Sequence, residues 1–260
     1  MRCKCNLLVL LLSFVLSLAS CSGDVEQADM MQGDEILVAP TAGPALGCEK
    51  VDGCRVTGGG VDLNGNWDGS FEKGSNNRDR YEFGGQAGAN TALPPQPRGE
   101  WTHHQQHGPS GSFVFHAGTA SAPEGTMIEW VSCSDPGFCD PARHAPAKQI
   151  DFWGYGTFKN VKNVPDIIAN NVIAGVTLHF FVVNIDDCGE PGHTGKLDIS
   201  GCPDQGFGFR GDVDYVDCDC PDFYRITIYA DMSDSEIIYQ VYGYIKGGNL
   251  QIHPPTGYDE

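Results

Sequence analysis

Four histidines between Trp101 and His116 offer imidazole ligands for a metal ion. His103, His104 and His107 lie close together, and His116 follows shortly after them. Imidazole nitrogens at this spacing can converge on zinc or copper when a further ligand joins them. Because successive side chains of a strand point to opposite faces, His103 and His104 cannot both join one site. One candidate metal site therefore uses His103, His107 and His116.

Carboxylates form a second group of candidate ligands, and their oxygens suit calcium, which takes about six to eight of them. Acidic clusters lie at 62–68, 186–190 and 212–222. The first does not match an EF-hand loop, because Trp67 stands where glycine is needed, and its Asn64-Gly65 pair predicts a hairpin turn. In the second, Asp186, Asp187 and Glu190 follow an apolar run. We predict that these three residues bind calcium, with a solvated turn as the alternative.

The N-terminal residues have the composition of an export signal. Arg2 and Lys4 precede an apolar run that is too short to span a membrane, and small residues lead up to Cys21. This pattern predicts a secretory signal peptide over 1–20. The Leu18-Ala19-Ser20-Cys21 tetrad resembles the lipobox of bacterial lipoproteins, which implies that Cys21 carries the lipid. Ser22, where inner-membrane lipoproteins generally have aspartate, favours the outer membrane of a Gram-negative bacterium.

Eight cysteines remain in the mature chain, and an even number in an exported protein predicts disulfides. They are Cys48, Cys54, Cys133, Cys139, Cys188, Cys202, Cys218 and Cys220. Turn-forming residues separate Cys48 from Cys54 and Cys133 from Cys139. We therefore predict that each of these pairs closes a short loop.

The other four cysteines flank or lie within an insert at about 188–220. Cys218 and Cys220 would share one strand face, too far apart to bond to each other. If the strands around the insert form a hairpin, its base would pair Cys188 with Cys220 and leave Cys202 for Cys218. A zinc site made of these four thiolates is the alternative.

The charge of the chain excludes one class of partner. Without residues 1–20, fourteen Lys and Arg residues stand against thirty-four Asp and Glu residues, a net charge of −20. Such a surface repels the phosphates of nucleic acids and suits divalent cations or a basic partner. We expect no nucleic-acid ligand.

Strand signals dominate the chain after a tether at 21–47 that is rich in acidic and small residues. From residue 48 onward, short aromatic or β-branched runs alternate with Gly, Pro, Asn and Asp, and no stretch shows helical periodicity. In 150–158, Ile150 and Phe152 alternate with Asp151, and Gly154 and Gly156 indicate a bend or a close approach of backbones. The run 176–185 is apolar on both faces, as in a central strand. We predict one all-β domain over 48–260, an antiparallel sandwich or jelly roll of about ten strands.

Two glycine-rich motifs bound this domain. It begins Val56-Thr57-Gly58-Gly59-Gly60 and ends Gly247-Gly248-Asn249-Leu250-Gln251-Ile252-His253, with a Gly-Glu-Pro-Gly motif after Asp187. These motifs resemble those of a group of exported bacterial β domains that has no established activity. The resemblance implies the fold and the location and leaves the function open.

No nucleophile elbow, zinc-protease helix or phosphate-binding glycine loop occurs in the sequence. Aromatic residues offer a sugar-stacking platform, although strand aromatics are more often part of a core; they are Trp67, Trp101, Trp130, Trp153 and Tyr155. We therefore expect a non-catalytic module, either binding or structural, that is attached to the membrane by its lipid at the cell surface or in the periplasm, with a glycan or a protein as the ligand to consider. The alternative is a cation-dependent hydrolase or a carbohydrate-active protein.

Overall fold

The computed structural model describes residues 49–51, 53–68, 80–92, 95–108, 111–118, 124–135, 148–188, 220–234 and 236–255. These residues form strands and one short helix, in the order β1 (Glu49–Val51), β2 (Cys54–Asp68), β3 (Arg80–Ala89), β4 (Pro97–Gly108), β5 (Gly111–Gly118), β6 (Met127–Asp135), β7 (Gln149–Lys162), α1 (Asp166–Ala169), β8 (His179–Asp186), β9 (Phe223–Tyr229) and β10 (Ile237–His253). The prediction of an all-β fold is confirmed, and α1 is the one described helix that the sequence patterns missed.

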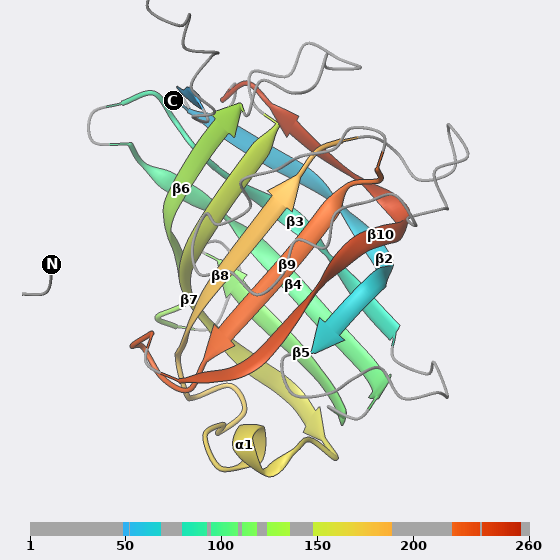
Figure 1. Cartoon of the computed structure of the whole chain (residues 1–260). Helices are drawn as coiled ribbons and strands as arrows, with labels where there is room; N and C mark the ends of the chain where they lie inside the picture. Colours follow the sequence, from blue (N-terminus) through green and yellow to red (C-terminus); the bar gives the residue numbers. More distant parts are fainter. Residues whose placement is uncertain are drawn as a thin grey trace, which may run out of the picture. The chain divides into compact units, whose positions relative to one another are not determined.

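The strands join into a sheet that closes on itself. Around the described ring the order is β7, β5, β4, β3, β2, β10, β9 and β8, and β8 pairs again with β7. All of these pairings are antiparallel, and in Figure 1 β8, β9 and β10 cross in front of β3, β4 and β5. The expected sandwich or jelly roll is therefore wrong: the sheet forms an eight-stranded barrel. A closed sheet leaves no free edges, which removes the need for a second sheet to cover its core face.

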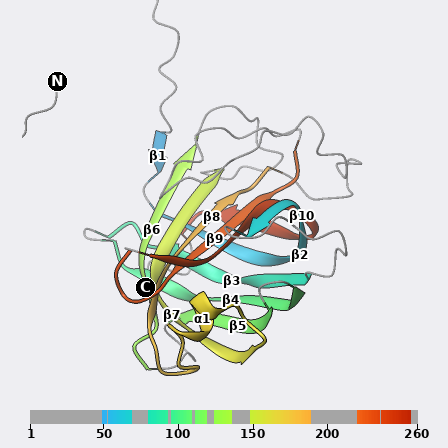
Figure 2. The ribbon, with the colours of Figure 1, turned by 60° about the horizontal axis from the view of Figure 1, so that its bottom comes forward.

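β7 changes partner along its length, and glycine allows the change. Its first half pairs with β6 on one side, and its second half pairs with β5 on that same side. Near this change of partner, a Cβ atom on Gly154 would lie 2.1 Å from the carbonyl oxygen of Met127. The predicted close approach of backbones at Gly154 is thus confirmed. Figure 2, which brings the α1 end of the barrel forward, shows β1 and β6 continuing beyond the ring.

The two glycine-rich motifs that bound the domain are neighbours in the barrel. β2 pairs with β10 so that Val56 faces Ile252 and Gly60 faces Gly248. β2 continues through Asn64 and Gly65, where its register against β10 shifts, so the predicted hairpin turn there is wrong. Gly60 has a packing role, since a Cβ atom there would lie 2.7 Å from the ring of Phe83.

Aromatic side chains from opposite walls fill the barrel interior. Phe83 of β3 stacks on Tyr224 of β9 with ring centroids 3.7 Å apart, and Phe113 of β5 meets Tyr239 of β10 at 4.9 Å. The predicted strand over 176–185 is confirmed only from His179 onward, where β8 is buried on both faces; Val176 lies before the strand and is 69% exposed.

A chain of hydrogen bonds crosses this interior through His103. The Trp101 indole N–H donates to the Tyr224 hydroxyl at 3.3 Å, and that hydroxyl lies 3.2 Å from His103 Nδ1. His103 Nε2 lies 2.9 Å from the Tyr239 hydroxyl. We assign the tautomer in which Tyr224 donates to Nδ1 and the Nε2–H donates to Tyr239, because the indole can only donate. A neutral His103 thus satisfies polar groups in an otherwise apolar core.

The disulfides differ from the predicted pairs. Cys54, at the start of β2, bonds to Cys133 of β6, and both are buried in the core. The predicted pairs Cys48–Cys54 and Cys133–Cys139 are therefore wrong, because strand packing brings Cys54 and Cys133 together across 79 residues of sequence.

Cys188 is a buried free thiol, whereas Cys220 is disulfide-bonded. The predicted Cys188–Cys220 pair is therefore wrong. Burial raises the pKa of the Cys188 thiol well above its usual range, so this thiol stays protonated. Cys48, Cys139, Cys202 and Cys218 lie outside the described residues, as does Glu190.

The helix α1 is too short to cross a bilayer, and no other helix occurs in the described ranges.

Replacing Cys54 and Cys133 together by alanine should lower the melting temperature, because the bond restricts a long loop of the unfolded chain. A loss of about 2–4 kcal/mol in the free energy of unfolding is expected. Thermal unfolding measures this loss, and non-reducing peptide mapping of the unaltered protein should find the Cys54–Cys133 peptide. The Cys188→Ala variant is the control that should keep this linked peptide. A Cys48–Cys54 peptide from folded protein would contradict the assignment.

Candidate ligand-binding groove

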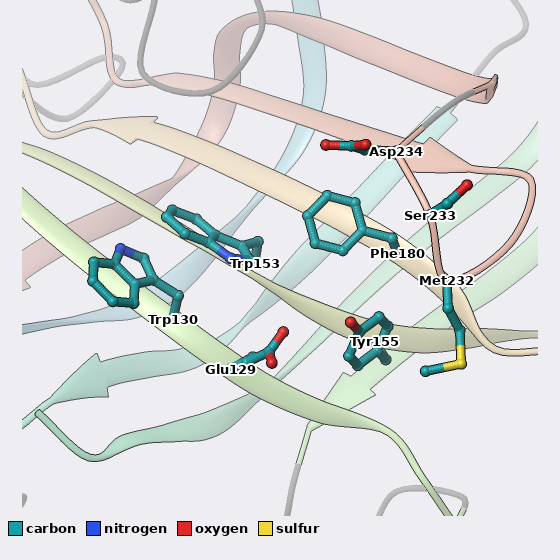
Figure 3. Close-up of a pocket in the computed structure, with 8 residues that line it drawn as sticks. All are labelled: Glu129, Trp130, Trp153, Tyr155, Phe180, Met232, Ser233 and Asp234. Atoms are coloured by element: carbon teal, nitrogen blue, oxygen red, sulfur yellow. The ribbon is translucent and has the colours of Figure 1, made fainter. Parts of the chain in front are cut away.

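A groove lined by aromatic side chains crosses the outer wall of the barrel over β6, β7 and β8. It has a volume of about 420 Å³ and is lined by Glu129, Trp130, Trp153, Tyr155, Phe180, Met232, Ser233 and Asp234. Figure 3 shows Trp153 between Trp130 and Phe180, with Glu129 and Asp234 on opposite sides of the row of rings. This volume falls within the range of about 300–1,000 Å³ typical of small-ligand sites.

Strand alternation turns these rings outward. On β7, Phe152 faces the barrel core while Trp153 and Tyr155 face outside, as the period of two requires. The register then places Trp130 of β6 opposite Trp153, and Phe180 of β8 opposite Tyr155. The groove floor is therefore built from three adjacent strands paired in the order β6, β7 and β8, which hold the rings more rigidly than a loop would.

The rings contact one another as a continuous surface. Trp130 and Trp153 stack with centroids 5.3 Å apart and planes 20° apart. Tyr155 meets Phe180 at 6.1 Å, and Phe180 meets Tyr229 of β9 at 5.4 Å. Phe180 and Tyr229 are buried, whereas Trp130 is 47% exposed. Buried rings thus support an exposed one, an arrangement in which a ligand can stack without reordering its site.

The turn that joins β9 to β10 forms one side of the groove and is fixed to β8. The Phe180 N–H donates to the Asp231 carbonyl at 2.7 Å, and His179 Nδ1 donates to the Tyr229 carbonyl at 2.9 Å. Burial lowers the pKa of His179, so the ring is neutral and the Nδ1–H is the donor. The Ser233 N–H donates to the Asp231 carboxylate at 2.6 Å. These bonds hold the segment that carries Met232 and Asp234 in place.

Polar groups next to the groove are engaged with one another. The Arg225 Nε–H donates to Asn184 Oδ1 at 2.7 Å, and the Asn184 amide donates to Asp151 at 2.6 Å. Burial raises the pKa of Asp151, while the Asn184 hydrogen bond and the charge of Arg225 oppose this rise. The positive charge of Arg225 is therefore offset by a neighbouring carboxyl group.

The carboxylates predicted to bind calcium have structural partners. Asp187 accepts the Ile252 N–H at 2.8 Å. Asp186 is buried on the outer face of β8, and burial raises its pKa well above the usual range, with the Asp151 charge adding to the effect. Glu190, the third expected ligand, lies outside the described residues, so the calcium site stays a prediction.

Asp222, at the end of the third acidic cluster, ties β10 to the end of β8. It is fully buried, and its two oxygens accept the backbone N–H groups of Cys188 and Leu250, each at 3.0 Å. Within the described parts of the chain, no three His, Cys, Asp or Glu side chains lie close enough to hold a metal ion.

The histidines of the alternative metal site do not gather. His103 points into the barrel, whereas His116 lies on the outer face, where its Nδ1 is 3.1 Å from the Thr102 hydroxyl. Residues on opposite faces of one wall cannot bind the same ion, so a site with both His103 and His116 is wrong. The side chain of His107 is outside the described set.

Of the five aromatic residues considered as a sugar-stacking platform, three come together. Trp130, Trp153 and Tyr155 line the groove, while Trp101 is a core residue. The side chain of Trp67 is not described. Sequence reasoning missed Phe180, which looked like part of a doubly buried strand, and Met232, Ser233 and Asp234, whose turn reaches β8 only through barrel closure.

No family model, curated protein or solved structure matches this chain in comparisons with known proteins.

The neutral, buried His103 should make the fold sensitive to acid. Burial lowers the pKa of His103 from 6.5 to about 3, and the charge of His104 adds to the effect. The unfolded chain therefore binds one more proton than the folded chain between these pH values. This stability is fully present above pH 6.5 and is lost toward pH 3, by at most about 1.4 kcal/mol per pH unit.

Urea unfolding at several pH values between 7 and 4 tests this effect. The slope of unfolding free energy against pH should decrease strongly in His103→Gln and much less in the comparison variant His104→Gln, which removes only the smaller contribution of the His104 charge. NMR of the unaltered protein offers a second measurement, in which the His103 ring should not titrate above about pH 4. A His103 signal that titrates near pH 6.5 would refute the assignment.

Proposed function

We propose that this protein is an exported, lipid-anchored binding module that holds a glycan in the aromatic groove on its barrel wall. The observation that carries the proposal is the stacked Trp130–Trp153 pair, in which Trp130 is exposed and Trp153 is half-buried on the rigid barrel wall. A large exposed aromatic surface costs solubility, and on natural proteins such patches generally serve binding. Aromatic rings are also strong anchors at binding sites.

The chemistry of the groove suits a sugar. The C–H faces of a sugar ring are apolar and can lie against the electron-rich face of an indole or phenol ring. Sugar hydroxyls can then donate to carboxylates at the edge of the stack, where Glu129 and Asp234 stand. Because aromatic side chains fill the barrel interior, the outer wall is the better candidate for the binding surface.

The location belongs to the proposal and rests on the sequence. The Leu18-Ala19-Ser20-Cys21 tetrad implies acylation at Cys21, and two or more acyl chains anchor a protein stably to a bilayer. A module on a tether at the outer membrane would meet glycans of the cell envelope or of the surroundings.

The described residues hold no feature that specifically favours the hydrolase alternative. The buried carboxyl groups of Asp151 and Asp222 are engaged with side chains and backbone, as described above. Binding without catalysis is therefore the function we put forward.

Trp130→Ala should weaken glycan binding at least tenfold, because the loss of an aromatic anchor typically reduces the binding free energy by about 2 kcal/mol. A glycan array probed with the mature domain identifies a ligand, and calorimetry with that ligand measures the loss. Val61→Ala is the matched control, since Val61 is 49% exposed on β2 while Trp130 is 47% exposed. An array with no bound glycan, or equal affinity for Trp130→Ala and the unaltered domain, would overturn the proposal.

Cys21→Ala should release the protein from the membrane fraction, because the acyl chains attach to that thiol. Fractionation of cells that express the variant measures this, with Cys188→Ala as the control that stays membrane-bound. Continued membrane association of Cys21→Ala would refute the lipid anchor and would not bear on the proposed glycan binding.

A further inference from the structure

The segments that border the aromatic groove carry negative charge only. Residues 124–130 lead into and form the first part of β6, and residues 230–234 and 236 lie between β9 and β10. Neither segment contains Lys, Arg or His, and their acidic residues, all exposed, are Glu124, Glu129, Asp231, Asp234 and Glu236. Hydrogen bonds from the Ser233 side chain and backbone lower the pKa of Asp231, so this carboxylate stays ionised in mild acid. The groove therefore lies between two anionic rims.

Basic side chains near the groove do not cancel this field. Arg225, on the outer face of β9, has its charge offset by Asp151 through Asn184. The chain as a whole carries a net charge of −18. A cation that approaches the groove thus meets carboxylates at its rims and the electron-rich faces of indole rings on its floor, and both attract it.

From this combination we infer that the groove binds a cationic saccharide, an oligomer of amino sugars whose amines are protonated. The inference rests on the proposed function and adds the charge of the ligand. Sugar rings stack on Trp130 and Trp153, and their ammonium groups lie toward Glu129 on one side and Asp234 on the other. An anionic polysaccharide would be repelled by the same carboxylates.

The strand pairing of the groove floor favours a saccharide over an extended basic peptide. In the middle of the floor, β7 is paired with β6 on one side and with β8 on the other. The backbone N–H and C=O groups of β7 are therefore used within the sheet, and a peptide lying across Trp153 and Tyr155 cannot pair with β7 as a further strand. The floor offers ring faces instead, and stacking needs no backbone groups from the ligand.

Two oligosaccharides with the same backbone test the inference. The probes are a hexamer of N-acetylglucosamine, which is neutral, and its fully de-N-acetylated form, which is cationic in mild acid. The mature domain should bind the cationic hexamer at least about tenfold more tightly at about 0.01 M salt. The preference should shrink at about 1 M salt, where the Debye length falls from about 30 Å to about 3 Å.

Variants separate the rim charges from the overall charge of the protein. The Glu129→Gln, Asp234→Asn double variant should lose most of the preference for the cationic hexamer. The matched control, Glu82→Gln with Glu100→Gln, removes the same charge from β3 and β4 and should keep the preference. Trp130→Ala should weaken the binding of the cationic hexamer both in the unaltered domain and in the Glu82→Gln, Glu100→Gln variant.

Each other outcome has a definite meaning. Equal, Trp130-dependent binding of the two hexamers would overturn the inference about charge and leave the proposed glycan module standing. A preference that Glu82→Gln with Glu100→Gln also removes would overturn the assignment to the rims. Trp130-dependent binding of hexalysine, with no binding of either hexamer, would overturn the saccharide in favour of a basic peptide.

Discussion

The pairing of β7 with β8 is the contact on which the rest of the structure depends. It joins Gln149 to Asp186 and Gly156 to His179 and turns an open sheet into a barrel. Without it, the aromatic interior would be open to water along two strand edges, and Phe180 would not lie beside Tyr155. Core and groove are therefore consequences of one row of backbone hydrogen bonds.

A single strand serves both sides of this wall. On β7, Phe152 and Phe158 pack inward while Trp153 and Tyr155 face the groove. Because the side-chain period of a strand is two, a shift of register by one residue would exchange these sets. The buried interior penalises such a shift, so the packing that stabilises the fold also fixes the position of the groove rings.

Polar groups inside the fold act mainly as structural ties. His103 links β4 to β9 and β10 in the interior, and Asp222 links the end of β8 to β10. Each forms hydrogen bonds with backbone or side-chain groups that would otherwise be buried without partners. Every such unpartnered group would destabilise the fold by about 1–3 kcal/mol. The groove is different, because its large rings face water beside exposed carboxylates.

Properties that depend on near neighbours along the chain were predictable from the residue pattern. Alternation gave the strand over 150–158 and its two faces, continuous apolar character gave the doubly buried β8, and Gly154 indicated a close approach of backbones. Each follows from the period of a strand or from the absence of a Cβ atom.

Which distant residues meet depends on the order and register of the strands in the folded barrel. The Cys54–Cys133 bond, the opposite placement of His103 and His116, and the meeting of Trp130, Trp153 and Phe180 all follow from strand order and register. The turn-forming residues between nearby cysteines predicted short disulfide loops instead, because local sequence does not indicate which distant strands pair. The choice of a barrel over a sandwich has the same cause, because a barrel closes through pairing between strand edges. The sequence of a strand indicates which of its side chains face the core, but it does not indicate which strand it pairs with.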